Sequence, residues 1–276
     1  MSDPTLPLGR AADWLRAADA VLITAGAGLG IDSGLPDFRG PAGFWGVYPA
    51  LGRAGIAFES IANPAAFIRD PQLAWGFYGH RLNLYRNTVP HAGFRRLLGL
   101  AAGKPHGMRI FTSNVDGQFQ KAGFASDTLC EIHGSIHHLQ CIDNCRGSIW
   151  PADDFQPLVD AEHCRLLNDA PCCPHCGALA RPNILMFGDT DWEARRTALQ
   201  YRRLTDWLAG TERPLCIEIG AGSAIPTVRH FSEQHGWRLI RINPHEAQVP
   251  NPQTGIGLPL GGLAGLERLG QALAAG

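Results

Sequence analysis

A glycine-rich stretch at residues 24–40, TAGAGLGIDSGLPDFRG, holds the densest group of chemically special residues in the chain. Gly26, Gly28 and Gly30 let the backbone turn sharply and approach a ligand closely. Free backbone N–H groups in such a loop can hold a pyrophosphate. The dinucleotide fingerprint G-x-G-x-x-G is incomplete because residue 31 is isoleucine, so the glycines alone also fit a plain strand-to-helix turn.

The end of this stretch favours a ligand site over a plain turn. Asp37, Phe38 and Arg39 place a carboxylate, a large apolar ring and a cation beside the glycines. A ribose, an aromatic base and a phosphate each find a suitable partner among these three side chains. The stretch therefore predicts a nucleotide-binding loop.

Three further polar residues follow apolar segments and are candidates for chemistry. Asn114 and Asp116 lie two residues apart after the apolar segment MRIFT. A local turn in which the side chains bond the backbone also explains this spacing. His133 stands in EIHGS, and the near-neutral pKa of histidine suits a general base, although a lone histidine is more often structural.

The cysteines indicate a metal site. Five of the eight stand in close groups, namely Cys141, Cys145, Cys172, Cys173 and Cys176. Disulfides are the alternative, but grouped cysteines in a chain without an export signal more often bind metal. Four thiolates suit a closed tetrahedral Zn²⁺ site that is structural rather than catalytic.

These residues need a scaffold, and the hydrophobic pattern predicts one. Apolar runs at 19–24, 108–114, 214–220 and 238–243 are typical of buried strands. Helical patterns cover 10–18, 62–86, 91–102 and 262–274, whereas 137–182 shows only weak periodicity.

Strands separated by helices predict an α/β fold with a parallel sheet and crossover helices. Ligands of such sheets bind beyond the carboxyl ends of the strands. The loops at those ends are residues 26–39, 112–116 and 220–223, together with Asn243. The predicted site lies where these four segments meet.

The composition excludes several other classes of function. The chain has 276 residues, a formal net charge of −1, 45% hydrophobic and 18% charged residues, which favours a globular fold and argues against nucleic-acid or membrane-surface binding. The first residues lack a signal-peptide pattern, and no apolar run reaches 18 residues. We therefore expect a cytoplasmic protein without nucleic-acid or membrane partners.

At this level of detail the sequence resembles a known family. GAGLGIDSGLPDFRG resembles the NAD-binding signature of the sirtuins. Four other segments agree in order and spacing, namely TSNVDGQFQKAG, EIHGSIHHLQC, CPHCGALARPNILMFGD and IRINPHE. The resemblance covers about residues 20 to 250.

The resemblance implies a fold, an activity and two cofactors. It implies a Rossmann-type NAD-binding domain (8–40, 87–136 and 182–276), with a smaller domain made of a helical insert (41–86) and a zinc-binding module (137–181). The implied activity is NAD-dependent removal of acyl groups from lysine in acylated protein substrates, which yields nicotinamide and O-acyl-ADP-ribose. NAD and Zn²⁺ are the implied cofactors.

The resemblance also implies roles for individual residues. His133 is the implied general base, Asn114 orients ribose and water, and Asp116 binds the nicotinamide carboxamide. The implied cofactor contacts are Gly26, Ala27, Gly28, Asp37, Phe38, Arg39, Ser113, Asn114, Asp116, His133, Gly220, Gly222, Ser223, Asn243 and Glu246. The implied zinc ligands are Cys141, Cys145, Cys173 and Cys176, with Cys172 as an alternative to Cys173 and with His163 or His175 as further candidates.

One pair bears on the acyl group. Tyr78 and Arg81 lie three residues apart on a predicted helix, so they share a face, and a surface pair is the plain explanation. Sirtuins that remove succinyl or malonyl groups carry Tyr-x-x-Arg in a similar context. An arginine pairs well with a carboxylate, so the pair implies acetyl and/or succinyl or malonyl removal. Leu185, Phe187 and Gly188 are predicted to flank the substrate backbone.

Three departures from the sirtuin pattern keep an alternative open. Ser113 stands where the family usually has glutamine, Gly30 replaces a usual serine, and GAGS at 220–223 matches the phosphate loop only loosely. The alternative is an ADP-ribosyltransferase or NAD glycohydrolase on the same fold.

Overall fold

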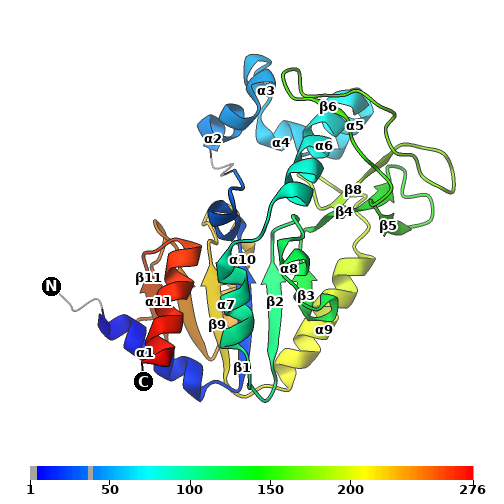
Figure 1. Cartoon of the computed structure of the whole chain (residues 1–276). Coiled ribbons are helices and arrows are strands. Elements are labelled where there is room, and N and C mark those ends of the chain that lie inside the picture. Colours follow the sequence, from blue (N-terminus) through cyan, green and yellow to red (C-terminus); the bar gives the residue numbers. More distant parts are fainter. Residues whose placement is uncertain (1–4, 37–39, 276) are drawn as a thin grey trace.

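A six-stranded parallel sheet forms the centre of the molecule. The computed structural model describes residues 5–36 and 40–275. The strand order is β11-β10-β9-β1-β2-β3, and every neighbouring pair is parallel. The strands are β1 (Ala20–Ala25), β2 (Met108–Thr112), β3 (Leu129–Glu131), β9 (Pro214–Ile219), β10 (Arg238–Ile242) and β11 (Gly255–Leu258). The predicted α/β fold with a parallel sheet is confirmed (Figure 1).

Helices cover both faces of this sheet because its central strands are apolar on both sides. Val21 and Ile23 of β1 pack in one core with Phe94 and Leu266, whereas Leu22 points into a second core. The first core contains α1 (Thr5–Ala17), α7 (Ala92–Leu100) and α11 (Gly262–Ala274). The second contains α9 (Arg195–Ala209) and α10 (Thr227–His235).

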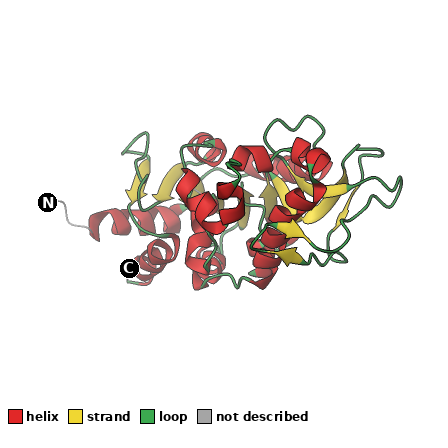
Figure 2. Cartoon of the chain, turned by 90° about the horizontal axis from the view of Figure 1, so that it is seen from above, coloured by secondary structure: helices red, strands yellow, loops and turns green. Residues whose placement is uncertain are grey.

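A smaller group of antiparallel strands lies at the end of the molecule away from the two termini (Figure 2). Strands β5 (Ile149–Pro151), β4 (Gly134–Cys141) and β8 (Ala180–Ile184) form one sheet, and β6 (Val159–Asp160) pairs with β7 (Arg165–Leu166). The weak periodicity of 137–182 therefore hides several short strands.

Short helices and the longer helix α6 (Pro71–Asn87) stand above the carboxyl edge of the large sheet (Figure 1). The short helices are α2 (Gly40–Val47), α3 (Pro49–Arg53), α4 (Phe58–Ile61) and α5 (Pro64–Arg69). The single helix predicted over 62–86 is wrong, because it is broken at Asp70, whose carboxylate accepts the N–H of Leu73 while Pro71 opens α6. Aromatic side chains hold this layer together, among them Phe44, Phe67, Trp75, Phe77 and Tyr78.

The remaining elements are short. They are η1 (Ala27–Ser33), α8 (Gln118–Lys121) and η2 (Ser126–Thr128). The segment TGIGLP, for which no strand was predicted, contains edge strand β11. Within residues 5–36 and 40–275 no helix has the length and apolarity to cross a membrane. The domain boundaries given above stay a prediction.

Candidate functional site

The candidate site lies at the carboxyl edge of the large sheet. Because the six strands are parallel, the loops after β1, β2, β9 and β10 all leave from this edge. The sequence placed Gly26, Asn114, Gly220 and Asn243 in these loops, and the structure does the same. Asp37, Phe38 and Arg39, also predicted to bind the cofactor, lie outside the described residues.

Two glycine loops interlock at the centre of this edge. The N–H of Gly26 donates to the carbonyl of Ile219 and that of Gly28 to the carbonyl of Gly220, each at 3.0 Å. Gly220 has φ +62°, and a Cβ there would lie 2.4 Å from the backbone of Gly28. These glycines are therefore required for close backbone contact. The N–H groups of Gly26 and Gly28 are both bonded within the protein, and pyrophosphate binding by other N–H groups of the loop stays a prediction.

Asn114 is fixed beside the first glycine loop. Its side-chain amide donates to the carbonyl of Gly26 at 3.0 Å, and its backbone N–H donates to Oγ1 of Thr112 at 3.0 Å. Ser113 bonds through its N–H to the carbonyl of Ala25 at 3.2 Å. The side-chain oxygen Oδ1 of Asn114 takes no part in these bonds, so it is available to accept a hydrogen bond from a ligand.

Asp116 is a buried carboxylate, 8% exposed, in the same loop. Its Oδ1 accepts the N–H of Gln118 at 2.9 Å, which is the local turn considered as an alternative, and its carbonyl accepts a bond from Nε2 of His137. Burial raises the pKa of Asp116 to about 6, although Gln118 and Arg81 act in the opposite direction. A carboxyl group with this pKa can exchange its proton near neutral pH. The side-chain oxygen Oε1 of Gln118 is buried and has no partner.

His133 follows β3 and lies next to the start of β4. Its carbonyl accepts the N–H of Leu185 at 2.9 Å, which ties it to the predicted substrate loop. Ile132 bonds through its N–H to the carbonyl of Thr112, so His133 is also tied to the Asn114 loop. Burial lowers the pKa of His133, and the imidazole is therefore neutral at neutral pH and able to accept a proton.

A network of hydrogen bonds centred on Glu246 joins the loops after β9 and β10, which hold several of the implied cofactor contacts. Ser223 donates to the Glu246 carboxylate through Oγ at 2.7 Å and through its N–H at 3.0 Å. Oδ1 of Asn243 accepts the N–H groups of His245 and Glu246, and its amide donates to the carbonyl of Ala221. A Cβ at Gly222 would lie 3.9 Å from Oε2 of Glu246.

Arg229 belongs to this end of the site and was not predicted. It lies 3.5 Å from the Glu246 carboxylate and also donates to the Glu246 carbonyl. No sequence pattern links Arg229 to Glu246, which lies 17 positions further along the chain. Only the fold brings α10 beside the β10 loop.

The predicted substrate loop follows β8. Leu185 and Phe187 are large apolar side chains with 38% and 36% exposure, and the N–H of Phe187 donates to the carbonyl of Ala62. Gly188 has φ +64° and follows them directly. Exposed apolar side chains beside His133 are available for contact with a peptide.

A buried ion pair closes this loop and was also missed by the sequence analysis. Arg181 donates twice to Asp189, with both N–O distances at 2.8 Å, and neither side chain has exposed surface. FGD was noted for its likeness to the family pattern, but the pairing to Arg181 has no local signal.

Tyr78 and Arg81 both lie on α6, as predicted. Tyr78 is 2% exposed and stacks on Phe67 with ring centroids 5.5 Å apart. Arg81 is half-buried and donates to Oη of Tyr85 through Nε at 3.1 Å and Nη2 at 2.6 Å. The plain surface pair is therefore wrong, because Tyr78 is in the core. Whether the two residues bind an acyl group stays a prediction.

The cysteine cluster has the geometry of a metal site. The Sγ atoms of Cys141, Cys145, Cys173 and Cys176 all lie within 4.8 Å of one another, and two of the distances are 3.6 Å. A tetrahedral site with Zn–S bonds of about 2.3 Å requires sulfur atoms about 3.8 Å apart. The four thiols therefore fit Zn²⁺.

The other predicted candidates for metal ligation lie outside this cluster of described residues. Cys172 is exposed, with its Sγ near the carbonyl of Ala170, and the imidazole of His163 bonds Asp160 at 2.7 Å. His175 is not among the clustered side chains. All eight cysteines are free of disulfides.

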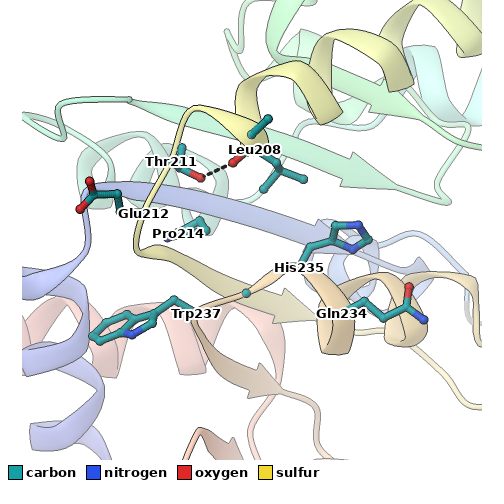
Figure 3. A pocket seen from close by; sticks show the side chains of 9 residues that line it. Leu208, Thr211, Glu212, Pro214, Gln234, His235 and Trp237 are labelled. Atoms are coloured by element: carbon teal, nitrogen blue, oxygen red, sulfur yellow. Dashed lines mark hydrogen bonds between the residues drawn. The ribbon is translucent and has the colours of Figure 1, made fainter.

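A pocket of about 450 Å³ lies away from this site (Figure 3). Its lining includes Pro214 at the start of β9, Thr211, His235 and Trp237. It therefore opens at the amino edge of the sheet, opposite the loops described above.

The fold and site together define a class of protein. It is a doubly wound α/β domain with Asn, Asp and His side chains at the carboxyl edge, joined to a small module with four clustered thiols. Within this class the chain belongs to the Sir2 family, whose family model matches residues 26–209. The resemblance to sirtuins is thereby confirmed.

Relatives and structures agree with this membership. The chain is 33% identical over 244 residues to NAD-dependent protein deacylase 2 of Pyrobaculum aerophilum, covering 86% of this chain and 85% of the relative. It is 29% identical over 256 residues to NAD-dependent protein deacylase sirtuin-5, mitochondrial, of Danio rerio, covering 88% and 78%. Its fold is similar to that in a crystal structure of a Sir2 homolog–NAD complex, with a TM-score of 0.70, 23% identity and coverage of 100% of this chain and 95% of that chain.

Proposed function

We propose that the protein is an NAD-dependent protein lysine deacylase that removes acetyl and/or succinyl or malonyl groups and releases nicotinamide and O-acyl-ADP-ribose. The observation that carries this proposal is that Asn114, Asp116 and His133 lie in neighbouring loops at the carboxyl edge, with the backbone of His133 bonded to the Leu185 loop. The relatives named as NAD-dependent protein deacylases support the same activity.

Several features of the site fit NAD. The interlocked glycines leave no room for side chains between two loops at the sheet edge. The free carbonyl oxygen of Asn114 and the unpartnered Oε1 of Gln118 are acceptors beside Asp116, as a ribose and a carboxamide require. Glu246 and Ser223 offer a carboxylate and a hydroxyl at the other end for a second ribose. NAD, when bound, supplies the activated glycosidic bond that drives cleavage of an unreactive amide.

The residues of the chain then have the following roles. His133, neutral because burial lowers its pKa, accepts a proton from a ribose hydroxyl. Asn114 orients the ribose and the water. Asp116 binds the carboxamide of nicotinamide, and Leu185, Phe187 and Gly188 hold the peptide backbone of the substrate as an added strand.

Arg81 and Tyr78 supply the preference for an acidic acyl group in this proposal. The cation of Arg81 pairs with a carboxylate, whereas an acetyl group has no partner for it. The same proposal includes acylated-lysine proteins as partners, a cytoplasmic location and one structural Zn²⁺ on Cys141, Cys145, Cys173 and Cys176.

Mass spectrometry of the products tests this function. The protein is incubated with NAD and a panel of acetylated, succinylated and malonylated peptides, and acyl-ADP-ribose is the expected product. ADP-ribosylated protein instead would identify a transferase. Free ADP-ribose without any need for peptide would identify an NAD glycohydrolase. Either of the latter results would refute the proposal.

A further inference from the structure

A second tyrosine on α6 holds the Arg81 side chain. Oη of Tyr85 accepts bonds from both Nε and Nη2 of Arg81, at 3.1 and 2.6 Å. The two residues are four positions apart, so they are neighbours on the helix surface. On the preceding turn Phe77 lies under the guanidinium, with Cζ 5.3 Å from its ring centroid. One edge of the cation is thereby bonded and one face is covered.

Tyr85 is itself held in place. It is only 5% exposed, and its carbonyl accepts a bond from the side-chain amide of Gln118 at 3.2 Å. The N–H of Gln118 in turn donates to the carboxylate of Asp116. A tyrosine has two side-chain torsions, so a buried ring places its hydroxyl group accurately. The end of α6 is thus anchored to the Asp116 loop at the point where Tyr85 contacts Arg81.

We propose that Tyr85 is a positioning residue for acyl specificity, which holds the Nε–Nη2 edge of Arg81 so that the guanidinium meets an acidic acyl group in one orientation. This inference rests on the acyl preference in the proposed function. Without the Tyr85 hydroxyl the Nε–Nη2 edge of Arg81 loses both of these bonds, so substrate binding has to order more of this long side chain. Immobilising such a side chain corresponds to roughly a three- to tenfold loss in affinity.

Steady-state kinetics with Tyr85→Phe tests the proposal. The phenylalanine keeps the ring and removes only the hydroxyl. On a succinylated peptide KM should rise by roughly three- to tenfold with kcat unchanged, and on the matching acetylated peptide neither constant should change. In an Arg81→Met background the same substitution should have no further effect, because Tyr85 acts through Arg81.

Tyr201→Phe is the matched control. Tyr201 is 38% exposed on α9, away from α6, so removing its hydroxyl should leave both peptides unaffected. Equal losses on both peptides with Tyr85→Phe, a further loss in the Arg81→Met background, or a gain on the succinylated peptide would each overturn the positioning role.

A second readout does not depend on activity. In NMR spectra the Nε–H signal of Arg81 should be protected from exchange in the wild type and lose that protection in Tyr85→Phe. Unchanged protection would overturn the proposal whatever the kinetics show. If Arg81→Met leaves the succinylated peptide unaffected while the NMR effect is present, the acyl preference of the proposed function is refuted, and the specificity role of Tyr85 with it.

Discussion

The buried pair Arg181–Asp189 gives the sharpest test of what stabilises the substrate loop. Both side chains have no exposed surface, and two N–O distances of 2.8 Å join them. The Asp189 carboxylate also accepts the N–H groups of Met186 at 3.3 Å and Asp191 at 3.2 Å. One carboxylate thus neutralises the buried cation and fixes both ends of the turn that carries Phe187.

Asp189→Asn keeps the size of the side chain and removes its charge. The Arg181 cation is then buried without a counter-charge, which costs about 3–5 kcal/mol of the free energy of unfolding. Each kcal/mol corresponds to roughly 2–4 °C in melting temperature for a chain of this order of size. Calorimetry should therefore show a large drop in melting temperature. KM for the peptide should rise as well, because the loop loses its anchor.

The same substitution at an exposed pair is the control. Arg202 and Asp206 on α9 lie 3.9 Å apart, and their side chains are 80% and 74% exposed. Asp206→Asn should change stability by no more than about 0.5 kcal/mol. Equal effects of the two substitutions would refute the reasoning. Removing the cation as well, as in Arg181→Met with Asp189→Asn, should recover much of the loss, because no unpaired charge remains and the asparagine still offers an acceptor to the turn.

Four further predictions follow from the site and its surroundings. His133→Ala should reduce deacylation by about 10²–10⁴-fold while calorimetry shows nearly normal NAD binding, and near-normal turnover would refute the base assignment. Elemental analysis should find one zinc per chain, and Cys141→Ser should give insoluble or metal-free protein; well-folded wild type without zinc would contradict this. Arg81→Met should lower kcat/KM by roughly ten- to hundredfold on succinylated peptide but not on acetylated peptide, and equal losses would assign Arg81 to structure. Burial lowers the pKa of His138 to about 4, so its contribution to the free energy of unfolding is complete above pH 6.5 and is lost as the pH falls toward 4, by up to about 1.4 kcal/mol per pH unit. His138→Gln should therefore make the melting temperature depend less on pH between 4 and 6.5, and an unchanged pH dependence would contradict this prediction.

The parts of the fold that could be predicted depend on burial of continuous apolar segments. β1, β2, β9 and β10 are buried apolar runs, and the structure shifts their predicted ends by no more than a residue or two. β11 was missed because GIGL has two glycines, which weaken a strand signal, and because it pairs on one side only. The break at Asp70 was missed although Asp-Pro is a helix-start signal, because the apolar pattern on either side was read as continuous.

The strands of the smaller sheets were not predicted for a different reason. Strands β5, β6 and β7 are two or three residues long, too short for any periodic pattern. The four clustered cysteines come from the end of β4, the turn that follows it and the turn before β8, and a metal held there would stabilise the fold. The grouping of the cysteines therefore indicated a metal site in a segment whose strands gave no signal.

For the site, the sequence predicted the positions of some residues but not their individual contacts. That Asn114 and Asp116 lie at the carboxyl edge follows from the predicted parallel strands, whereas His133 was identified by the resemblance because the three-residue strand β3 before it was not predicted. The hydrogen-bond partners of backbone groups at the site could not be predicted, because these partners come from elements that are distant in sequence. The N–H groups of Gly26 and Gly28, for example, join the loop after β1 to the end of β9. Gly220, with no room for a Cβ, makes this junction possible. The glycines of the opening motif therefore bring two loops into backbone contact at the carboxyl edge of the sheet.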